Sequence, residues 1–269
     1  MSVVANMNAV EVVGASKIFN EGTANQVDAL LDVNLTIALG PSGCGKSTLL
    51  RLIANLLEPT QGEISVNGKA SVQARLDQDY GMAFQQAGLF DWRTVGKNIE
   101  LPLELKGWNK KKREARVAEM LELVKLQDFG SMYPWQLSGG MQQRVAIARA
   151  LAAHPPLLLM DEPFGALDEM TREYMQGELL RICAETSTTV VFVTHSIPEA
   201  VYLSNRVVVM SPRPGRILQV ISVNLGSKRS ELTRAADGFF RSITSVREAL
   251  RGTHAQHVAS TAIRGAEDR

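Results

Sequence analysis

The strongest constraint on the fold of this chain is a glycine-rich octapeptide, Gly40-Pro-Ser-Gly-Cys-Gly-Lys-Ser47, which runs directly into an apolar helical segment. Glycines let successive backbone N–H groups turn inward around phosphate oxygens, because no side chain intervenes. Lys46 would then reach the β- and γ-phosphates of a nucleotide, and Ser47 would ligate Mg²⁺. A glycine-rich turn that only caps a helix is the alternative. Since such a loop normally connects a strand to a helix, an α/β domain is expected.

Hydrophobic patterns along the rest of the chain agree with this fold class. Segments 157–160 and 189–194 are unbroken apolar or β-branched runs, which are typical of strands buried in a parallel sheet. A helical pattern over about 169–185 separates them, and alternating strands and helices predict an α/β layered domain. Residues between about 94 and 154 are rich in Ala, Leu, Glu, Lys and Arg, which predicts a mostly helical block inserted into that domain. Further strands are expected over residues 10–19, 29–39, 62–66, 81–84, 206–210 and 217–223, and an amphipathic helix near the C-terminus.

Composition excludes several classes of protein. The 269 residues carry a net charge of +1, which gives no electrostatic footprint for nucleic acid. The longest apolar runs fall far short of the ~18 residues that a membrane span needs. The N-terminus shows no basic start ahead of an apolar block, and two cysteines cannot form a disulfide framework. These features predict a soluble protein of a reducing, cytoplasmic compartment.

Two neighbouring acids end one of the predicted buried strands, in the string Leu157-Leu-Leu-Met-Asp161-Glu162-Pro163. In α/β sheets, ligand chemistry gathers at the carboxyl ends of the strands. Asp161 suits a Mg²⁺ partner, directly or through water, and Glu162 suits the base that polarises an attacking water. The alternative is a pair of acids at a helix start, where the helix dipole favours negative charge.

A second glycine-containing loop, Leu137-Ser138-Gly139-Gly140, precedes a helix rich in Ala and Arg. Ser138 and the two glycines would make a second anion site at a helix N-terminus. Two such sites for one nucleotide make sense if each chain lends this loop to the phosphate site of a second copy. A helix N-cap followed by glycines is the alternative.

Three further residues are candidate site residues, and each also has an ordinary structural interpretation. Gln85 follows an apolar strand and would approach the Mg²⁺ and the attacking water, or would be a solvated strand-end glutamine. His195 also follows a strand and would hydrogen-bond the γ-phosphate, or would be structural. Phe19 would stack on adenine, or would be a core aromatic.

The order and spacing of these motifs resemble the nucleotide-binding subunit of ATP-binding cassette (ABC) transporters over residues 7–225. The resemblance implies an α/β P-loop NTPase fold of the ABC type, with a parallel-sheet core, an antiparallel β subdomain and an inserted helical subdomain at about 86–149. Residues 226–269 would form a C-terminal helical tail. It assigns the catalytic roles to Glu162, His195 and Gln85, and the Mg²⁺ contacts to Ser47, Gln85 and Asp161. It assigns ATP binding to Phe19, Gly40, Pro41, Ser42, Gly43, Cys44, Gly45, Lys46, Ser47, Thr48, Ser138, Gly139, Gly140 and Gln142.

The resemblance also implies a function and partners. The chain would be an ATPase that powers import through separate transmembrane permease subunits, from the cytoplasmic face of the inner membrane as a peripheral subunit. ATP would lie between two head-to-tail copies, or between this chain and a paralogous ATPase subunit. A solute-binding protein would take part indirectly, and no nucleic acid would be involved. Three strings starting at Phe84, Thr194 and Ser211 are similar to the importer group for nitrate, sulfonates and taurine.

The sequence departs from the family pattern in three places. Met141 stands where glutamine is common, and Ser196 where an acid often follows the histidine. Before the phosphate loop about eight residues are absent, roughly the length of one strand. Segment 33–39 can supply that strand only by leaving its usual place. Either the deletion is real and lowers ATPase activity, or a segment of the native protein is missing from the chain.

Two other functions therefore remain open at this stage. One is a soluble ABC-type ATPase that acts on DNA or ribosomes. Such proteins carry a long coiled coil or two fused cassettes, whereas the stretch between Lys46 and Ser138 has no sustained heptads. The other is a nucleotide-binding subunit with impaired hydrolysis, which only the missing strand favours.

Overall fold

The structure is a computed structural model, and it describes residues 9–21, 23, 26–35, 44–186, 188–212, 214–226 and 229–251. The chain divides into two compact units, one made of residues 1–71 and 193–269 and the other of residues 72–192. Each unit is described by itself.

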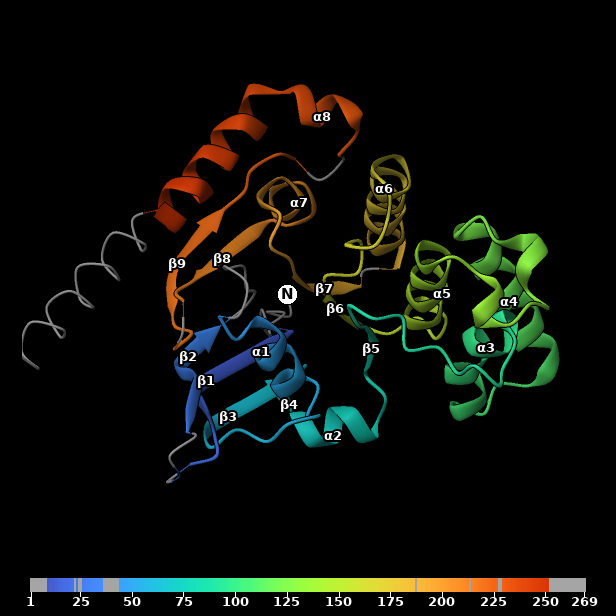
Figure 1. Ribbon diagram of the computed structural model, residues 1–269, viewed down its shortest axis with the longest axis horizontal. Helices are drawn as coiled ribbons and strands as arrows, with labels where there is room; N and C mark the ends of the chain where they lie inside the picture. Colours follow the sequence, from blue (N-terminus) through green and yellow to red (C-terminus); the bar gives the residue numbers. More distant parts are fainter. Residues whose placement is uncertain are drawn as a thin grey trace, which may run out of the picture. The chain divides into compact units, whose positions relative to one another are not determined.

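The first unit contains a four-stranded antiparallel sheet in the order β2-β1-β3-β4 (Figure 1). β1 (Val10–Phe19) lies between β2 (Val27–Leu35) and β3 (Gln61–Val66), and β4 (Lys69–Ala70) follows β3 at the edge. At the start of β1, Val10 and Val12 are buried while Glu11 and Val13 are exposed. This alternation is the period-2 pattern of a sheet with one covered face, and it confirms the predicted strand.

Helices and a hairpin complete this unit. They are α1 (Lys46–Ile53), α7 (Ile197–Leu203), the antiparallel pair β8 (Arg206–Met210) and β9 (Ile217–Ser222), α8 (Glu231–Ala235) and a helix over residues 237–251. The last helix confirms the predicted amphipathic segment, because Phe239, Ile243 and Val246 are buried. Phe240 of the same helix is 56% exposed and lies outside this buried face.

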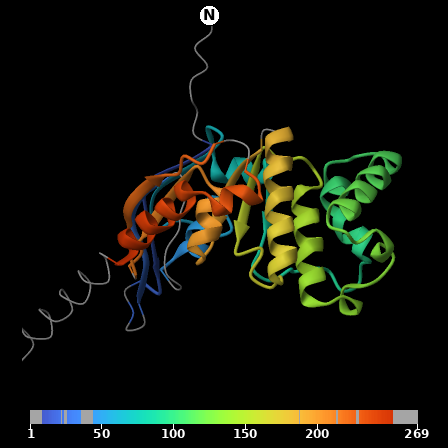
Figure 2. The same ribbon diagram turned by 90° about the horizontal axis from the view of Figure 1, so that it is seen from above.

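The second unit contains the sheet β5-β6-β7, formed by β5 (Tyr80–Ala83), β6 (Leu157–Asp161) and β7 (Thr189–Val193). β5 and β6 pair in parallel, and all five residues of β6 are buried, as predicted for a central strand. Its helices are α2 (Ser71–Leu76), α3 (Val95–Leu105), α4 (Lys110–Leu123), α5 (Gly139–Leu151) and α6 (Glu169–Thr186), with short 3₁₀ helices at Gln127–Phe129 and Pro134–Gln136. Figure 2 shows α5 and α6 side by side. Among the described residues, no helix is both long enough and apolar enough to cross a membrane.

The segment before the phosphate loop does not join the parallel sheet within the part of the chain that the structure describes. β2 ends at Leu35 and is an edge strand of the antiparallel sheet, paired only with β1 there. Residues 36–43 lie outside the described residues. The expected strand over 29–39 is therefore observed as residues 27–35, in the antiparallel sheet beside β1.

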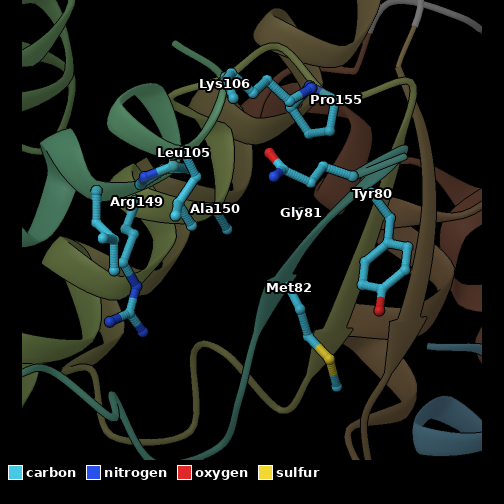
Figure 3. A pocket seen from close by; sticks show the side chains of 12 residues that line it. Tyr80, Gly81, Met82, Leu105, Lys106, Arg149, Ala150 and Pro155 are labelled. Carbon is cyan, nitrogen blue, oxygen red and sulfur yellow. The ribbon is translucent and has the colours of Figure 1, made fainter. Parts of the chain in front are cut away.

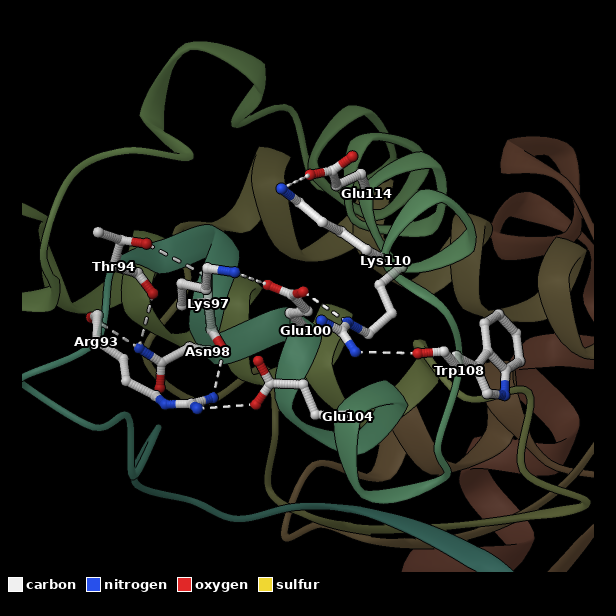
Figure 4. A network of polar contacts seen from close by, with 10 residues as sticks. Arg93, Thr94, Lys97, Asn98, Glu100, Glu104, Trp108, Lys110 and Glu114 are labelled. Carbon is white, nitrogen blue, oxygen red and sulfur yellow. Dashed lines mark hydrogen bonds and ion pairs between the residues drawn. The ribbon is translucent and has the colours of Figure 1, made fainter.

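A network of ion pairs joins α3 to α4 in the helical region (Figure 4). Glu100 accepts hydrogen bonds from Lys97 Nζ at 2.5 Å and from Arg113 Nε at 2.7 Å, and its side chain is only 5% exposed. Arg113 also donates to the carbonyl oxygen of Trp108 at 3.0 Å. Burial alone would raise the pKa of Glu100, but the hydrogen bonds from Lys97 and Arg113 outweigh it and lower the pKa.

Glu100→Gln is expected to lower the free energy of unfolding by about 1.5–3 kcal/mol at pH 7, because charge-assisted hydrogen bonds are lost. A lowered pKa in the folded state stabilises the protein above the ordinary value of 4.5, and this stability is lost as the pH falls through the lowered pKa. Urea unfolding should therefore show a difference between wild type and variant that shrinks below pH 4.5. Glu114→Gln is the control, because its contact with Lys110 is 3.8 Å long and exposed. A difference that stays constant from pH 3 to pH 7 contradicts the assignment.

Candidate functional site

The parallel register of β5 and β6 brings two predicted site residues together in the second unit. The register pairs Ala83 with Met160, so the residues that follow these two strands leave the sheet at the same edge. Gln85 Nε2 donates to Glu162 Oε2 at 3.4 Å. Asp161, the last residue of β6, is 4% exposed. The pair of acids thus ends a buried strand, and the glutamine lies beside the second acid.

Glu162 has a left-handed backbone conformation, with φ +47°. A non-glycine residue in this region costs about 1–3 kcal/mol and persists only where its surroundings hold it. The carbonyl oxygen of Glu162 accepts from the N–H of Gly165 at 3.1 Å, and Phe164 is buried and stacks on Phe192 with ring centroids 5.7 Å apart. The tight turn after β6 is therefore anchored in the core, and it directs Glu162 off the line of the strand.

The loop before α5 is preformed as a helix N-terminus with an exposed end. Ser138 caps α5, since its hydroxyl accepts from the N–H of Met141 at 3.3 Å, and Ser138 and Gly139 are exposed. Gln142 turns back and donates to the carbonyl oxygens of Pro134 at 2.9 Å and Leu137 at 3.3 Å. The N-cap interpretation and the anion-site interpretation both fit, because a capped helix end still presents N–H groups and positive potential.

In the first unit the start of α1 carries the described part of the phosphate loop. Gly45 has φ +96°, a conformation that favours glycine, and it is the N-cap of α1. Lys46 is 5% exposed, and its Nζ donates to Cys44 Sγ at 3.9 Å. Burial raises the pKa of the Cys44 thiol, and the charge of Lys46 opposes the rise. Ser47 and Thr48 are half-buried, while Gly40, Pro41, Ser42 and Gly43 lie outside the described residues.

His195 and Phe19 are accessible in the first unit. The His195 side chain is exposed, and the backbone around it is held on both sides. The Thr194 hydroxyl donates to the buried Glu199 carboxylate and accepts from the Ser196 N–H at 3.0 Å. Phe19 is half-buried at the end of β1, with Lys17 Nζ 5.4 Å from its ring centroid. His195 is thus exposed and Phe19 partly exposed at the surface of this unit.

The donor set predicted for Mg²⁺ matches the chemistry of that ion. Ser47, Gln85 and Asp161 offer a hydroxyl, an amide carbonyl and a carboxylate, and Mg²⁺ prefers such hard oxygen ligands. Among the described residues there is no group of three or more His, Cys, Asp or Glu side chains that could hold a metal. Mg²⁺ sites in proteins usually also include water and substrate phosphate oxygens.

Two side chains of α5 hold the segment around Gln85, a role that was not predicted from the sequence. Gln143 Nε2 donates to the carbonyl oxygen of Phe84 at 2.9 Å. Arg149 donates to the carbonyl oxygens of Ala87 at 2.9 Å and Gly88 at 2.8 Å. The sequence did contain a signal for the role of Gln143. Residues three and four positions later, Ala146 and Ile147, are apolar and lie on the same helix face, and a polar side chain buried on such a face needs a hydrogen-bond partner.

Comparison with known proteins agrees with the motifs. Residues 32–165 match the family model described as ABC transporter. An ABC transporter ATP-binding protein of Methanocaldococcus jannaschii, MJ0412, is 49% identical over 82% of this chain and 84% of its own length. The taurine import ATP-binding protein TauB of Pelagibacter ubique is 48% identical over 74% of this chain and 77% of its own. The aliphatic sulfonates import ATP-binding protein SsuB of Bacillus cereus is 46% identical over 84% of this chain and 90% of its own length.

The solved structures point the same way. The ATP-binding cassette MJ0796, in a dimeric post-hydrolysis state bound to ADP and Pi, superposes with a TM-score of 0.73 at 35% identity. The match covers 80% of this chain and 99% of that one. The predicted fold class is thereby confirmed. The chain belongs to the ABC transporter family, as an ATP-binding subunit.

Proposed function

We propose that this chain hydrolyses ATP in order to drive the import of a small solute through separate membrane subunits. The observation that carries the proposal is the pair Gln85–Glu162 beside the buried Asp161, at the carboxyl end of a buried parallel strand. Relatives named as import ATP-binding proteins support the transport role. In domain terms, residues 7–225 would be the ATP-binding domain with a helical insertion at about 86–149, and residues 226–269 a helical tail.

Each candidate residue has a task in this reaction. Transfer of the γ-phosphoryl group to water needs mainly positioning and charge neutralisation. Lys46 and the backbone N–H groups of Gly40–Thr48, apart from Pro41, which has none, bind the phosphates, and Phe19 stacks on the adenine. Glu162 accepts a proton from the attacking water, which Gln85 and His195 orient. A bound Mg²⁺, held through Ser47, Gln85 and Asp161, would neutralise the developing phosphate charge.

The second nucleotide contact comes from another copy of the chain or from a paralogous ATPase subunit. Ser138, Gly139, Gly140 and Gln142 stand at an exposed helix N-terminus, which suits a phosphate group of a neighbouring subunit's ATP. The dimeric form of the cassette MJ0796 supports this arrangement. Closure of the dimer on ATP and its reopening after hydrolysis would be the mechanical step.

The membrane subunit would dock on the second unit, against the insertion at about 86–135. A cavity of about 240 Å³ lies there between β5, α3 and the end of α5 (Figure 3). In Figure 3, Tyr80 and Met82 of β5 lie across this space from Leu105 and Arg149, and Leu105 is 65% exposed. An apolar cavity of this size fits side chains of a short helix from a permease. The chain would then be a peripheral subunit at the cytoplasmic face of the inner membrane.

The solute is proposed to be a small anion of the nitrate, sulfonate or taurine type. A strain without this chain should grow on sulfate but fail on taurine or an alkanesulfonate as the only sulfur source. The wild-type chain should restore growth, and the Glu162→Gln variant should not. If the deletion strain instead fails to grow only when nitrate is the nitrogen source, the solute is nitrate. Normal growth on all three contradicts the proposed solute class.

The two alternatives are not favoured by the relatives, and a biochemical assay separates them. The purified chain should hydrolyse ATP with Mg²⁺, whereas a hydrolysis-impaired subunit would bind ATP without turnover. Stimulation of that activity by ribosomes or DNA, but not by proteoliposomes that carry the permease, would favour the soluble ATPase instead.

A further inference from the structure

We propose that Gln143 and Arg149 are positioning residues that set the location of Gln85 against Glu162, a role that rests on the proposed ATPase function. All four residues belong to the second unit. The two positioning residues lie on α5 and bind the backbone on both sides of Gln85. They act through Gln85 and touch no reacting atom.

Gln143 holds the backbone on the N-terminal side of Gln85. Its side chain is buried, with 2% exposed, and its amide nitrogen donates to the carbonyl oxygen of Phe84, the residue directly before Gln85. An unsatisfied buried amide would cost about 1–3 kcal/mol, so this bond holds helix and segment together. Because Phe84 and Gln85 share a peptide group, a shift of the Phe84 carbonyl moves the Gln85 backbone with it.

Arg149 holds the backbone on the C-terminal side of Gln85. Its guanidinium donates through two nitrogens to consecutive carbonyl oxygens, those of Ala87 and Gly88, at 2.9 Å and 2.8 Å. Burial lowers the pKa of Arg149, and hydrogen bonds from a charged donor are about twice as strong as neutral ones. The planar fork of the guanidinium also fixes the orientation of the two carbonyl groups relative to α5.

The helix that carries these anchors begins at the exposed Ser138–Gly140 loop. α5 is one helix of 13 residues, so its first turn and the residues at positions 143 and 149 move as one body. A force on the loop from a neighbouring subunit's nucleotide would therefore reach Gln85 through two sets of hydrogen bonds. The arrangement links phosphate contact at one end of α5 to the position of a catalytic side chain in the same chain.

A kinetic double-mutant cycle tests the role. Gln143→Met keeps the length of the side chain and removes its donor, and we expect kcat to fall about 10–100-fold while KM for ATP changes less than about twofold. Introduced on top of Gln85→Ala, the same change should lower kcat by less than about twofold more, because the residue that it positions is gone. Equal effects in both backgrounds, or a loss expressed in KM, would overturn the proposal.

Arginine variants supply the rescue and the control. Arg149→Met should lower kcat like Gln143→Met, and Arg149→Lys should recover part of it, because lysine keeps a charged donor. Arg116→Met is the matched control: Arg116 also donates to two consecutive carbonyl oxygens of the α5 end, those of Leu151 and Ala152, at 3.2 Å and 2.9 Å. It should lower the melting temperature without a selective loss of kcat. A kcat loss equal to that of Arg149→Met would overturn the proposal.

A measurement without turnover separates this proposal from the proposed function. The heteronuclear NOE of the backbone amides of residues 85–89, measured by NMR, should fall in Gln143→Met and Arg149→Met and stay unchanged in Arg116→Met. If the wild-type chain hydrolyses no ATP but these amides become mobile as expected, the proposed function fails and the anchoring holds. Unchanged NOE values in both variants overturn the anchoring, whatever the ATPase activity.

Discussion

Replacing Glu162 with glutamine is expected to lower kcat for ATP hydrolysis by about 10²–10⁴-fold while ATP still binds. That is the range that a positioned general base contributes. Glutamine keeps the length and shape of the side chain and has the same cost at the left-handed φ of +47°, so the turn after β6 should persist. The hydrogen bond from Gln85 has an amide oxygen as its acceptor in the variant. Steady-state kinetics and a filter assay of ATP binding would measure the two quantities.

Glu169→Gln is the matched control for this variant. Glu169 is an exposed acid in the first turn of α6, where it needs no role beyond the favourable effect of the helix dipole. Its replacement should leave kcat within about twofold, which distinguishes a catalytic acid from an acid that merely starts a helix. Hydrolysis by Glu162→Gln at close to the wild-type rate would show that the helix-start interpretation was correct.

The sequence pattern predicted those parts of the site that are determined by residues next to one another in the chain. The buried strand over 157–160 is confirmed, because an unbroken apolar run leaves few alternatives to a central strand, whereas the roles of the two acids at its end stay predictions. The Gln85–Glu162 contact depends on the register of β5 against β6, which joins residues far apart in the chain. Their positions after predicted strands suggested that both residues approach one attacking water, but no local pattern gave the register that brings the two side chains into contact.

Other features were beyond sequence reasoning for physical reasons. The left-handed turn at Glu162 depends on Phe164 being held in the core, and no local propensity predicts a positive φ for glutamate. The polar Gln143 on an apolar helix face indicates that it needs a partner, but its partner and those of Arg149 are backbone carbonyls, which carry no sequence identity. The segment 29–39 was expected as one strand; the strand ends at Leu35 in the structure, and residues 36–43 lie outside the described residues.

Gly139→Ala is expected to leave the fold intact and to lower kcat on the order of 10²-fold, the scale for losing backbone donors to a transition-state oxyanion. Within the chain, a Cβ at Gly139 would meet nothing within 4 Å. Alanine also favours a helix over glycine by about 0.5–1 kcal/mol, so the melting temperature should stay or rise. The loss of activity would then come from outside the chain, where the methyl group keeps a phosphate of the partner's ATP away from the exposed loop.

Gly177→Ala on α6 is the control, because a Cβ there also has nothing within 4 Å, and it should stabilise the helix without changing kcat. A mixture of Gly139→Ala and Glu162→Gln chains gives a sharper test. In a head-to-tail pair of the two variants, the intact Glu162 of one chain meets the intact Gly139 of the other, so one complete site forms. The mixture should hydrolyse ATP well above the rate of either variant alone. A mixture no more active than its components would mean that the two residues serve the same nucleotide within one chain.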